Sequence, residues 1–200
     1  FIVENVRSAR RFLKRCDRSI EISELSFTVL DEHTDPADVP DMLSPLAEGM
    51  DMAVISEAGC PAVADPGALA VEAALRRGFD VQPLIGPSSI LLSLMASGFN
   101  GQKFAFEGYL PHDSGTRQRR LKEMTGRITR EDQTQIFIET PYRNNRLIAE
   151  LAKTLPGSMR LCVCSDLTGP DQKIACRSLA EWARASYNFD KIPAIFLLYK

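Results

Sequence analysis

The sequence lacks the features that mark several classes of protein. No run of about 18 apolar residues, the length that crosses a bilayer, occurs in its 200 residues, and no charged-then-apolar leader ends at a small-residue cleavage site. We therefore expect no membrane contact and a cytoplasmic location. There are only two histidines, and the five cysteines form no CxxC pair. This pattern lacks a zinc motif and predicts free thiols and no metal.

The sequence also lacks a strong excess of charge of one sign. Its formal net charge is −2, so contact with nucleic acid would depend on a local basic patch. Residues 117–122 contain four cations and are the strongest candidate for contacting phosphates. The same stretch is also consistent with a solvated helix face.

Apolar runs alternate with amphipathic stretches, which predicts an α/β fold with a parallel sheet in the first lobe. Apolar residues make up 44% of the chain, enough to bury a core. We expect a first lobe at 1–107, a linker at 108–116 and a second lobe with a mixed sheet at 117–200. The expected strands are 1–3, 26–30, 52–55, 81–84, 135–139, 161–165, 173–176 and 194–199. The expected helices are 6–16, 38–48, 67–77, 87–95, 117–124 and 143–155, with a short helix near Trp182.

Two loops follow apolar strands of the first lobe and precede helices. Residues 56–67 read SEAGCPAVADPG, and residues 84–89 read LIGPSS. Ligands collect at the carboxyl ends of parallel strands, where glycine permits close approach of the backbone. Both loops therefore predict one ligand crevice. The alternative is two ordinary connections, in which Asp65 and Ser88 cap the helices that follow.

A third strand-to-helix turn carries Glu139 and Arg143 on either side of Pro141. Because this turn also joins a strand to a helix, its position favours a ligand cleft. The alternative is a solvated ion pair or a helix cap without a functional role.

Taken together and in their order along the chain, these loops and turns resemble those of the tetrapyrrole methylase superfamily. Within it, they resemble the branch of 16S ribosomal-RNA 2'-O-ribose (cytidine) methyltransferases. The most specific phrase is FAFEGYLP at residues 104–111, which is similar to Phe-x-Phe/Tyr-Glu-Gly-Phe-Leu-Pro of that branch. SEAGCP resembles its Ser-Asp-Ala-Gly-Thr-Pro loop, ETPYR at 139–143 resembles Glu-Ser-Pro-His-Arg, and ENVR at 4–7 resembles Glu-Asp-Thr-Arg.

The resemblance implies a two-lobed fold that binds S-adenosyl-L-methionine (SAM) between the lobes, usually as a homodimer and without a metal. It also implies an additional first strand, which we expect to be missing here. The substrate would be a ribose hydroxyl of ribosomal RNA in the small ribosomal subunit. The residues implied for SAM are Ser56, Ala58, Gly59, Cys60, Pro87, Ser88 and Ser89.

Proton removal from a ribose hydroxyl needs a base, for which Glu4 is the first candidate and His33 the second. The alternative for His33 is an ordinary surface histidine. The candidate substrate-binding residues are Arg7, Arg117, Arg120, Glu139 and Arg143.

The chain departs from the branch at Glu57, Cys60, Asn5, Tyr142 and Gly169, where the branch has Asp, Thr, Asp, His and a basic residue. Two other functions therefore stay open. One is a methyltransferase of the same fold that acts on a small molecule such as a tetrapyrrole. The other is a non-catalytic protein that binds SAM or RNA.

Overall fold

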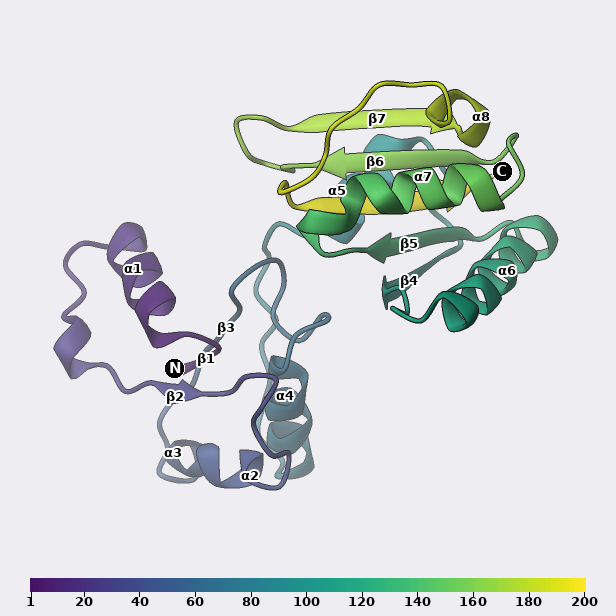
Figure 1. The fold of residues 1–200 in the computed structure, drawn as a ribbon. Helices are drawn as coiled ribbons and strands as arrows, with labels where there is room; N and C mark the ends of the chain where they lie inside the picture. Colours follow the sequence, from purple (N-terminus) through teal and green to yellow (C-terminus); the bar gives the residue numbers. More distant parts are fainter. The chain divides into compact units, whose positions relative to one another are not determined.

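The computed structural model describes residues 1–200, whose contacts separate into unit 1, Phe1–Ser88, and unit 2, Ser89–Lys200 (Figure 1). No helix in either unit is both long and apolar enough to cross a bilayer.

Unit 1 is built around a sheet of three short parallel strands. These are β1 (Ile2–Val3), β2 (Thr28–Val29) and β3 (Val54–Ile55), in the order β2-β1-β3. The parallel sheet predicted for the first lobe is confirmed. Because all three strands run the same way, the loops that follow them leave from one edge of the sheet.

Helices cover both faces of this sheet. Successive residues of a strand point to opposite faces, and Ile2 packs in a cluster with Leu30 and with residues of α2 (Val39–Met42) and α4 (Gly67–Arg76). Val3 is also buried and faces the other side, where α1 (Val6–Cys16) lies (Figure 1). The remaining helices are η1 (Ile22–Glu24) and α3 (Ser44–Ala47).

Two expectations for unit 1 are wrong. The helix expected at 38–48 is divided into α2 and α3, because Pro40 and Pro45 each occupy the first turn of a short helix and cannot donate a backbone N–H. The strand expected at 81–84 is absent, and Leu84 and Ile85 are exposed. The three-stranded sheet ends at β3, so this segment has no neighbouring strand to pair its backbone groups.

Unit 2 contains a five-stranded mixed sheet in the order β4-β5-β8-β6-β7. The pair β4–β5 is parallel and the other pairs are antiparallel, which confirms the predicted mixed sheet. The strands are β4 (Phe104–Tyr109), β5 (Thr134–Ile138), β6 (Arg160–Ser165), β7 (Lys173–Ser178) and β8 (Ala194–Tyr199). The helices are α5 (Ser89–Ser97), α6 (Ser114–Glu131), η2 (Pro141–Arg143), α7 (Asn144–Thr154) and α8 (Leu179–Trp182).

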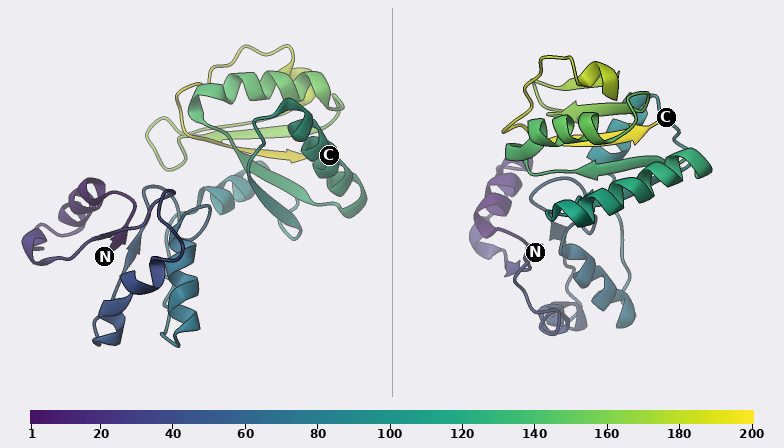
Figure 2. Two further views of the ribbon diagram at one scale, coloured as in Figure 1. Left: turned by 60° about the horizontal axis from the view of Figure 1, so that its bottom comes forward. Right: turned by 45° about the vertical axis from the view of Figure 1, so that its right-hand side comes forward.

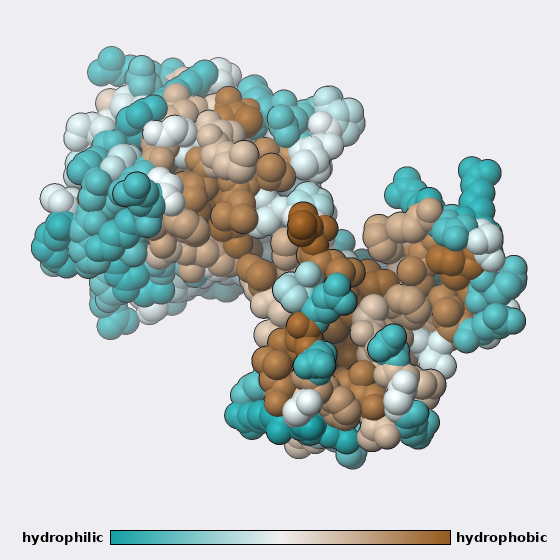
Figure 3. Space-filling view, turned by 180° about the vertical axis from the view of Figure 1, so that it is seen from behind, coloured by the Kyte–Doolittle hydropathy of each residue, from teal (hydrophilic) through white to brown (hydrophobic).

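Helices α5 and α7 lie on opposite faces of the unit 2 sheet (Figure 2), and an apolar cluster lies on each face. Phe137 packs with residues of α6, α7 and α8, including Trp182. Its neighbour Ile136 packs on the opposite face with Leu94 of α5. Seen from behind relative to Figure 1, both units show apolar surface as well as polar surface (Figure 3).

The observed division differs from the expected linker at 108–116. β4 pairs with β5 and α5 packs on the unit 2 sheet, so residues 89–107 belong to the second unit. Most of the expected linker is regular structure, because β4 extends to Tyr109 and α6 begins at Ser114.

Candidate functional site

The carboxyl edge of the unit 1 sheet gathers three of the predicted site segments. Val3, Val29 and Ile55 lie in register at the ends of β1, β2 and β3. Glu4 follows the first strand, the loop with His33 follows the second, and the loop at 56–66 follows the third. The structure therefore brings both candidate bases to the edge that carries the first ligand loop.

Asp65 and Gly67 shape the first ligand loop. Asp65 Oδ1 accepts the backbone N–H groups of Ala62 at 3.1 Å and of Gly67, the first residue of α4, at 2.7 Å. Pro66 rather than Asp65 is the N-cap residue of α4, and the Asp65 side chain holds the loop against the first residue of that helix. A Cβ at position 67 would lie 2.6 Å from Asp65 Oδ1 and 2.8 Å from Val54 Cγ1. Position 67 therefore requires glycine for close packing.

Glu4 is bonded to the same loop. Its Oε1 accepts the backbone N–H of Glu57 at 2.9 Å, and Ser56 Oγ donates to Gly59 O at 3.3 Å. Gly59 has φ +76°, a left-handed conformation in which glycine is unstrained. Within unit 1 the amides of Ala58 and Gly59 have no hydrogen-bond partner, so both can donate to a ligand.

The second ligand loop contacts the first inside unit 1. Cys60 Sγ lies 3.6 Å from Pro87 O, in the geometry of a weak S–H donor bond. The residues predicted from the two loops therefore meet at Cys60 and Pro87. Ser88 ends unit 1, whereas Ser89 begins α5 of unit 2.

His33 and Arg7 lie on exposed parts of unit 1. The His33 side chain is exposed, and its Nε2 lies 3.7 Å from Glu32 Oε1. A hydrogen bond from the His33 backbone N–H lowers the pKa of Asp31. Arg7 lies in the first turn of α1, whose N-cap Asn5 accepts the N–H groups of Arg7 and Ser8 at 2.9 and 3.2 Å. Asn5, which departs from the Asp of the branch, thus serves as a helix cap.

In unit 2, Glu139 and Arg143 form the ion pair that the sequence left as an alternative. The Glu139 carboxylate is 3% exposed, and its Oε1 accepts Arg143 Nη2 at 2.6 Å and Nε at 3.1 Å. Arg143 Nη1 also lies 2.6 Å from His112 Nδ1. Because a guanidinium can only donate, Nδ1 is the acceptor, and the neutral imidazole carries its hydrogen on Nε2.

Two of the four arginines predicted to bind substrate, Arg117 and Arg120, are engaged within unit 2. Arg117 is buried, and its Nε donates to Glu150 Oε1 at 2.8 Å. Arg120 pairs with the buried carboxylate of Glu107 and with Glu123. Their guanidinium groups therefore hold α6 to its neighbours, which corrects the expectation that they are free surface cations. In the basic stretch, Arg119 and Lys122 remain exposed.

Sequence analysis missed Glu107 as a structural residue. Its side chain is 3% exposed and is paired with Arg120 and, at 2.9 Å, with Arg127. A single carboxylate in the apolar phrase FAFEGYL was the available signal. The next residue, Gly108, has φ +66° in a bulge, because Phe106 pairs with Ile136 but Tyr109 pairs with Ile138.

Asn144 and Asn145 were also missed. Asn144 is buried, and its Nδ2 donates to the carbonyls of Phe189 and Ile192, both at 2.8 Å. Asn145 Oδ1 accepts the Phe189 N–H at 2.8 Å. These bonds hold the start of α7 to the segment before β8. Adjacent asparagines after a Pro-containing turn were the only signal.

Gly169, which replaces a basic residue of the branch, lies in the turn between β6 and β7. A Cβ there would overlap the carboxylate of Asp166, which accepts the Asp171 N–H at 2.9 Å. The conformation of this turn therefore excludes a basic side chain at position 169 unless Asp166 moves.

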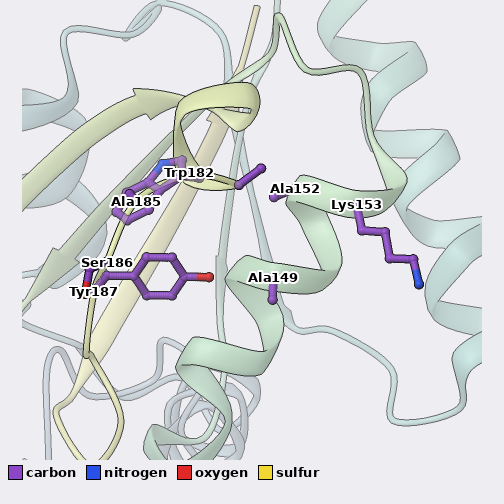
Figure 4. Close-up of a pocket in the computed structure, with 8 residues that line it drawn as sticks. Ala149, Ala152, Lys153, Trp182, Ala185, Ser186 and Tyr187 are labelled. Atoms are coloured by element: carbon purple, nitrogen blue, oxygen red, sulfur yellow. The ribbon is translucent and has the colours of Figure 1, made fainter.

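A pocket of about 530 Å³ lies in unit 2 beside α7 and α8 (Figure 4). Ala149 and Ala152 contribute from α7, and Trp182 and Tyr187 contribute from the other side. None of the predicted site residues lines it.

Comparison with known proteins identifies the family. Residues 25–183 match the family model of Tetrapyrrole (Corrin/Porphyrin) Methylases. The chain belongs to the tetrapyrrole methylase family. This confirms the superfamily predicted from the sequence.

A relative from Vibrio cholerae, named Ribosomal RNA small subunit methyltransferase I, is 30% identical over 200 residues, which cover 98% of this chain and 66% of the relative. A relative of the same name from Xylella fastidiosa is 35% identical over 140 residues, which cover 70% of this chain and 50% of the relative. The chain thus spans only part of the length of these curated relatives.

Solved structures confirm the fold class. The methyltransferase CobJ has a TM-score of 0.63 at 17% identity, covering 100% of this chain and 82% of CobJ. Uroporphyrin-III C-methyl transferase from Thermus thermophilus, complexed with S-adenyl homocysteine, has a TM-score of 0.54 at 17% identity and covers 92% of this chain and 81% of that chain.

Proposed function

We propose that this chain is part of a SAM-dependent methyltransferase that methylates a ribose hydroxyl of small-subunit ribosomal RNA. The observation that carries the proposal is its 30% identity, over 98% of the chain, to a relative named Ribosomal RNA small subunit methyltransferase I. That similarity spans both ligand loops. A structural neighbour in complex with S-adenyl homocysteine supports SAM as the methyl donor.

The first ligand loop suits a donor held mainly by backbone groups. The amides of Ala58 and Gly59 have no partner within unit 1, and Cys60 contacts Pro87 of the second loop. We assign the binding of the methyl donor SAM to Ser56, Ala58, Gly59, Cys60, Pro87, Ser88 and Ser89. The SAM sulfonium carries an activated methyl group, so the protein must chiefly align the acceptor and exclude water.

Glu4 has two roles in this proposal. Its Oε1 holds the ligand loop through Glu57 N–H, and its carboxylate, at the same sheet edge, is the first candidate to take the proton from the ribose hydroxyl. His33 is the second candidate, because it follows the neighbouring strand β2. Arg7 remains a candidate cation for substrate, whereas Arg143 is bonded to Glu139 and His112.

Tetrapyrrole methylation is the weaker alternative. The solved tetrapyrrole methyltransferases share the fold at 17% identity, and a shared fold does not determine the substrate. The relatives named for ribosomal RNA are nearly twice as similar in sequence. We further propose that the protein acts as a homodimer, as the resemblance implies, and that it is cytoplasmic.

The decisive experiment combines two measurements on the protein. Calorimetry measures SAM binding, and transfer of labelled methyl groups is measured with small ribosomal subunits and with a uroporphyrinogen acceptor. We expect SAM binding and label in ribosomal RNA alone. Label in the uroporphyrinogen acceptor would reverse the order of the two substrates, and SAM binding without label in either would contradict the RNA assignment. Absence of SAM binding would overturn the methyltransferase proposal.

A further inference from the structure

Two tyrosines are exposed at the carboxyl ends of the parallel strands β4 and β5. Tyr109 ends β4 and is 60% exposed, and Tyr142, in η2 directly after β5, is 76% exposed. Such exposure of aromatic rings forgoes the free energy that their burial would give. Parallel neighbours bring both strand ends to one edge of the unit 2 sheet.

The bulge at Gly108 determines which face of the sheet Tyr109 occupies. Without the extra residue, Tyr109 would alternate onto the α6 face, on which Glu107 meets its arginines. The bulge pairs Tyr109 with Ile138, which packs on the α5 face. The left-handed φ of Gly108 therefore turns Tyr109 away from α6 and leaves its ring uncovered.

A fixed histidine joins this edge. His112 follows β4 and accepts Arg143 Nη1 at Nδ1, while Arg143 is held by the buried carboxylate of Glu139. The imidazole is therefore held as the tautomer with hydrogen on Nε2, which leaves an N–H donor on an exposed residue. The charges of Arg143 and Glu139 offset each other, so this cluster adds little net charge.

We infer that Tyr109, His112 and Tyr142, here called the tyrosine platform, bind unpaired nucleotides of the ribosomal RNA substrate. Single-stranded RNA is recognised by stacking of its splayed bases on aromatic rings and by hydrogen bonds to base edges and 2'-hydroxyls. The tyrosine rings offer the stacking surfaces, and His112 Nε2–H offers the donor. Arg143 acts as a positioning residue for His112. This inference rests on the proposed function for the identity of the RNA.

The platform differs from a phosphate-binding surface in its dependence on salt. Each phosphate contacted by a cation steepens the fall of affinity with salt concentration. Base stacking carries no such ionic term. Substitution of a platform tyrosine is therefore expected to weaken binding at every salt concentration while leaving the salt slope unchanged.

The test compares Tyr109→Ala and Tyr142→Ala with Phe104→Ala. Phe104 is 38% exposed at the opposite end of β4, so it is a matched exposed aromatic outside the platform. Binding is measured by fluorescence anisotropy with a labelled single-stranded RNA of mixed sequence, and circular dichroism checks folding. We expect affinity to fall about tenfold for each platform tyrosine and to be unchanged for Phe104→Ala.

The roles of His112 and Arg143 are tested by measuring the His112 tautomer, which would not change if Arg143 had only a structural role. Nitrogen NMR of His112 reports the tautomer, which we expect to be fixed in the unsubstituted protein and mixed in Arg143→Lys. His112→Ala is expected to weaken RNA binding roughly fivefold. Unchanged affinity in both tyrosine variants would overturn the platform, as would an equal loss in Phe104→Ala.

Failure of the platform is distinguishable from failure of the proposed function. If the unsubstituted protein binds SAM and methylates small subunits while the tyrosine variants bind RNA normally, only the platform is wrong. If it does not bind SAM but binds RNA in a tyrosine-dependent way, only the methyltransferase proposal is wrong. If the variants lose binding to small subunits but not to the RNA oligonucleotide, the platform contacts ribosomal protein, and the RNA assignment is overturned.

Discussion

Units 1 and 2 differ in how they hold their functional residues. Unit 1 has three two-residue strands and a core of small and medium side chains, such as Ala70 and Ala74. Unit 2 has a five-stranded sheet with apolar clusters on both faces, one of which contains Phe137 and Trp182. The ligand loops of unit 1 are thus shaped by local polar bonds and glycine, whereas unit 2 holds its charged residues on a deeply packed scaffold.

The largest expected effect tests whether the two cores are independent. Phe137 is fully buried and stacks on Phe196 with ring centroids 5.8 Å apart. Phe137→Ala should destabilise unit 2 by about 3–5 kcal/mol. The matched change in unit 1, Leu30→Ala, should cost about 2–4 kcal/mol and act on unit 1 alone. Urea unfolding with hydrogen exchange resolves the two units, and one common transition shifted by both variants would contradict independence.

A smaller effect is expected where unit 2 buries a charge. Glu107→Gln removes the carboxylate that neutralises Arg120 and Arg127. The variant should lose about 2–3 kcal/mol of unfolding free energy, less than for a fully buried ion pair, because both guanidinium groups are partly solvated. Glu123→Gln is the matched control, since Glu123 pairs with the same Arg120 at the surface and should cost about 0.5 kcal/mol or less. Equal urea midpoints for the two variants would show that burial of Glu107 adds nothing.

The corresponding test in unit 1 concerns close packing. Gly67→Ala places a Cβ against Asp65 and Val54, so the ligand loop must shift. We expect a cost of about 1–3 kcal/mol, together with weaker SAM binding by calorimetry. Gly101→Ala is the control, because a Cβ there meets no atom within 4 Å. Unchanged SAM affinity in Gly67→Ala would show that the shape of this loop does not affect SAM binding.

The fold was predictable from the sequence where the pattern was local. The limits of α1 follow from its helical apolar periodicity, and those of β8 follow from its continuous apolar run. The predicted strand at 81–84 failed because a strand requires a pairing partner, which no local pattern reveals. β4 was missed because its Glu107 breaks the apolar alternation, and only the tertiary pairing with arginines of α6 accounts for it.

The candidate site was predictable to a different degree in each unit. The ligand loops could be found because they follow strands and contain glycine and proline. The sequence could not predict that Arg117 and Arg120 are not free to contact RNA, because it does not show that Glu150 and Glu107 lie beside them. Cation counts therefore overestimate an RNA surface when the acidic partners come from distant elements.

The smallest expected effect is a pH dependence of unit 2. Asp132 follows α6 and has a left-handed φ of +57°. Its carboxylate accepts hydrogen bonds from Tyr199 and Asn100 and forms an ion pair with Lys200 at 2.5 Å. These contacts, the bond to Lys200 above all, lower the pKa of Asp132. A carboxyl whose pKa is lowered by folding stabilises the protein above its unfolded-state pKa, and this contribution is lost as pH falls through the folded-state value.

Asp132→Asn tests that contribution with little change in backbone conformation, because asparagine also tolerates left-handed φ. Above about pH 4, the usual range of an unfolded aspartate, the variant should have a lower urea midpoint in unit 2 than the unsubstituted protein. Below the lowered folded-state pKa of Asp132 the two midpoints should converge, because the carboxyl is then protonated in both the folded and the unfolded state. Since Asp132 is solvated, the difference should be smaller than that caused by Glu107→Gln, and unit 1 should not respond. A pH-independent gap between the two proteins would assign the loss to the amide itself rather than to the charge of Asp132.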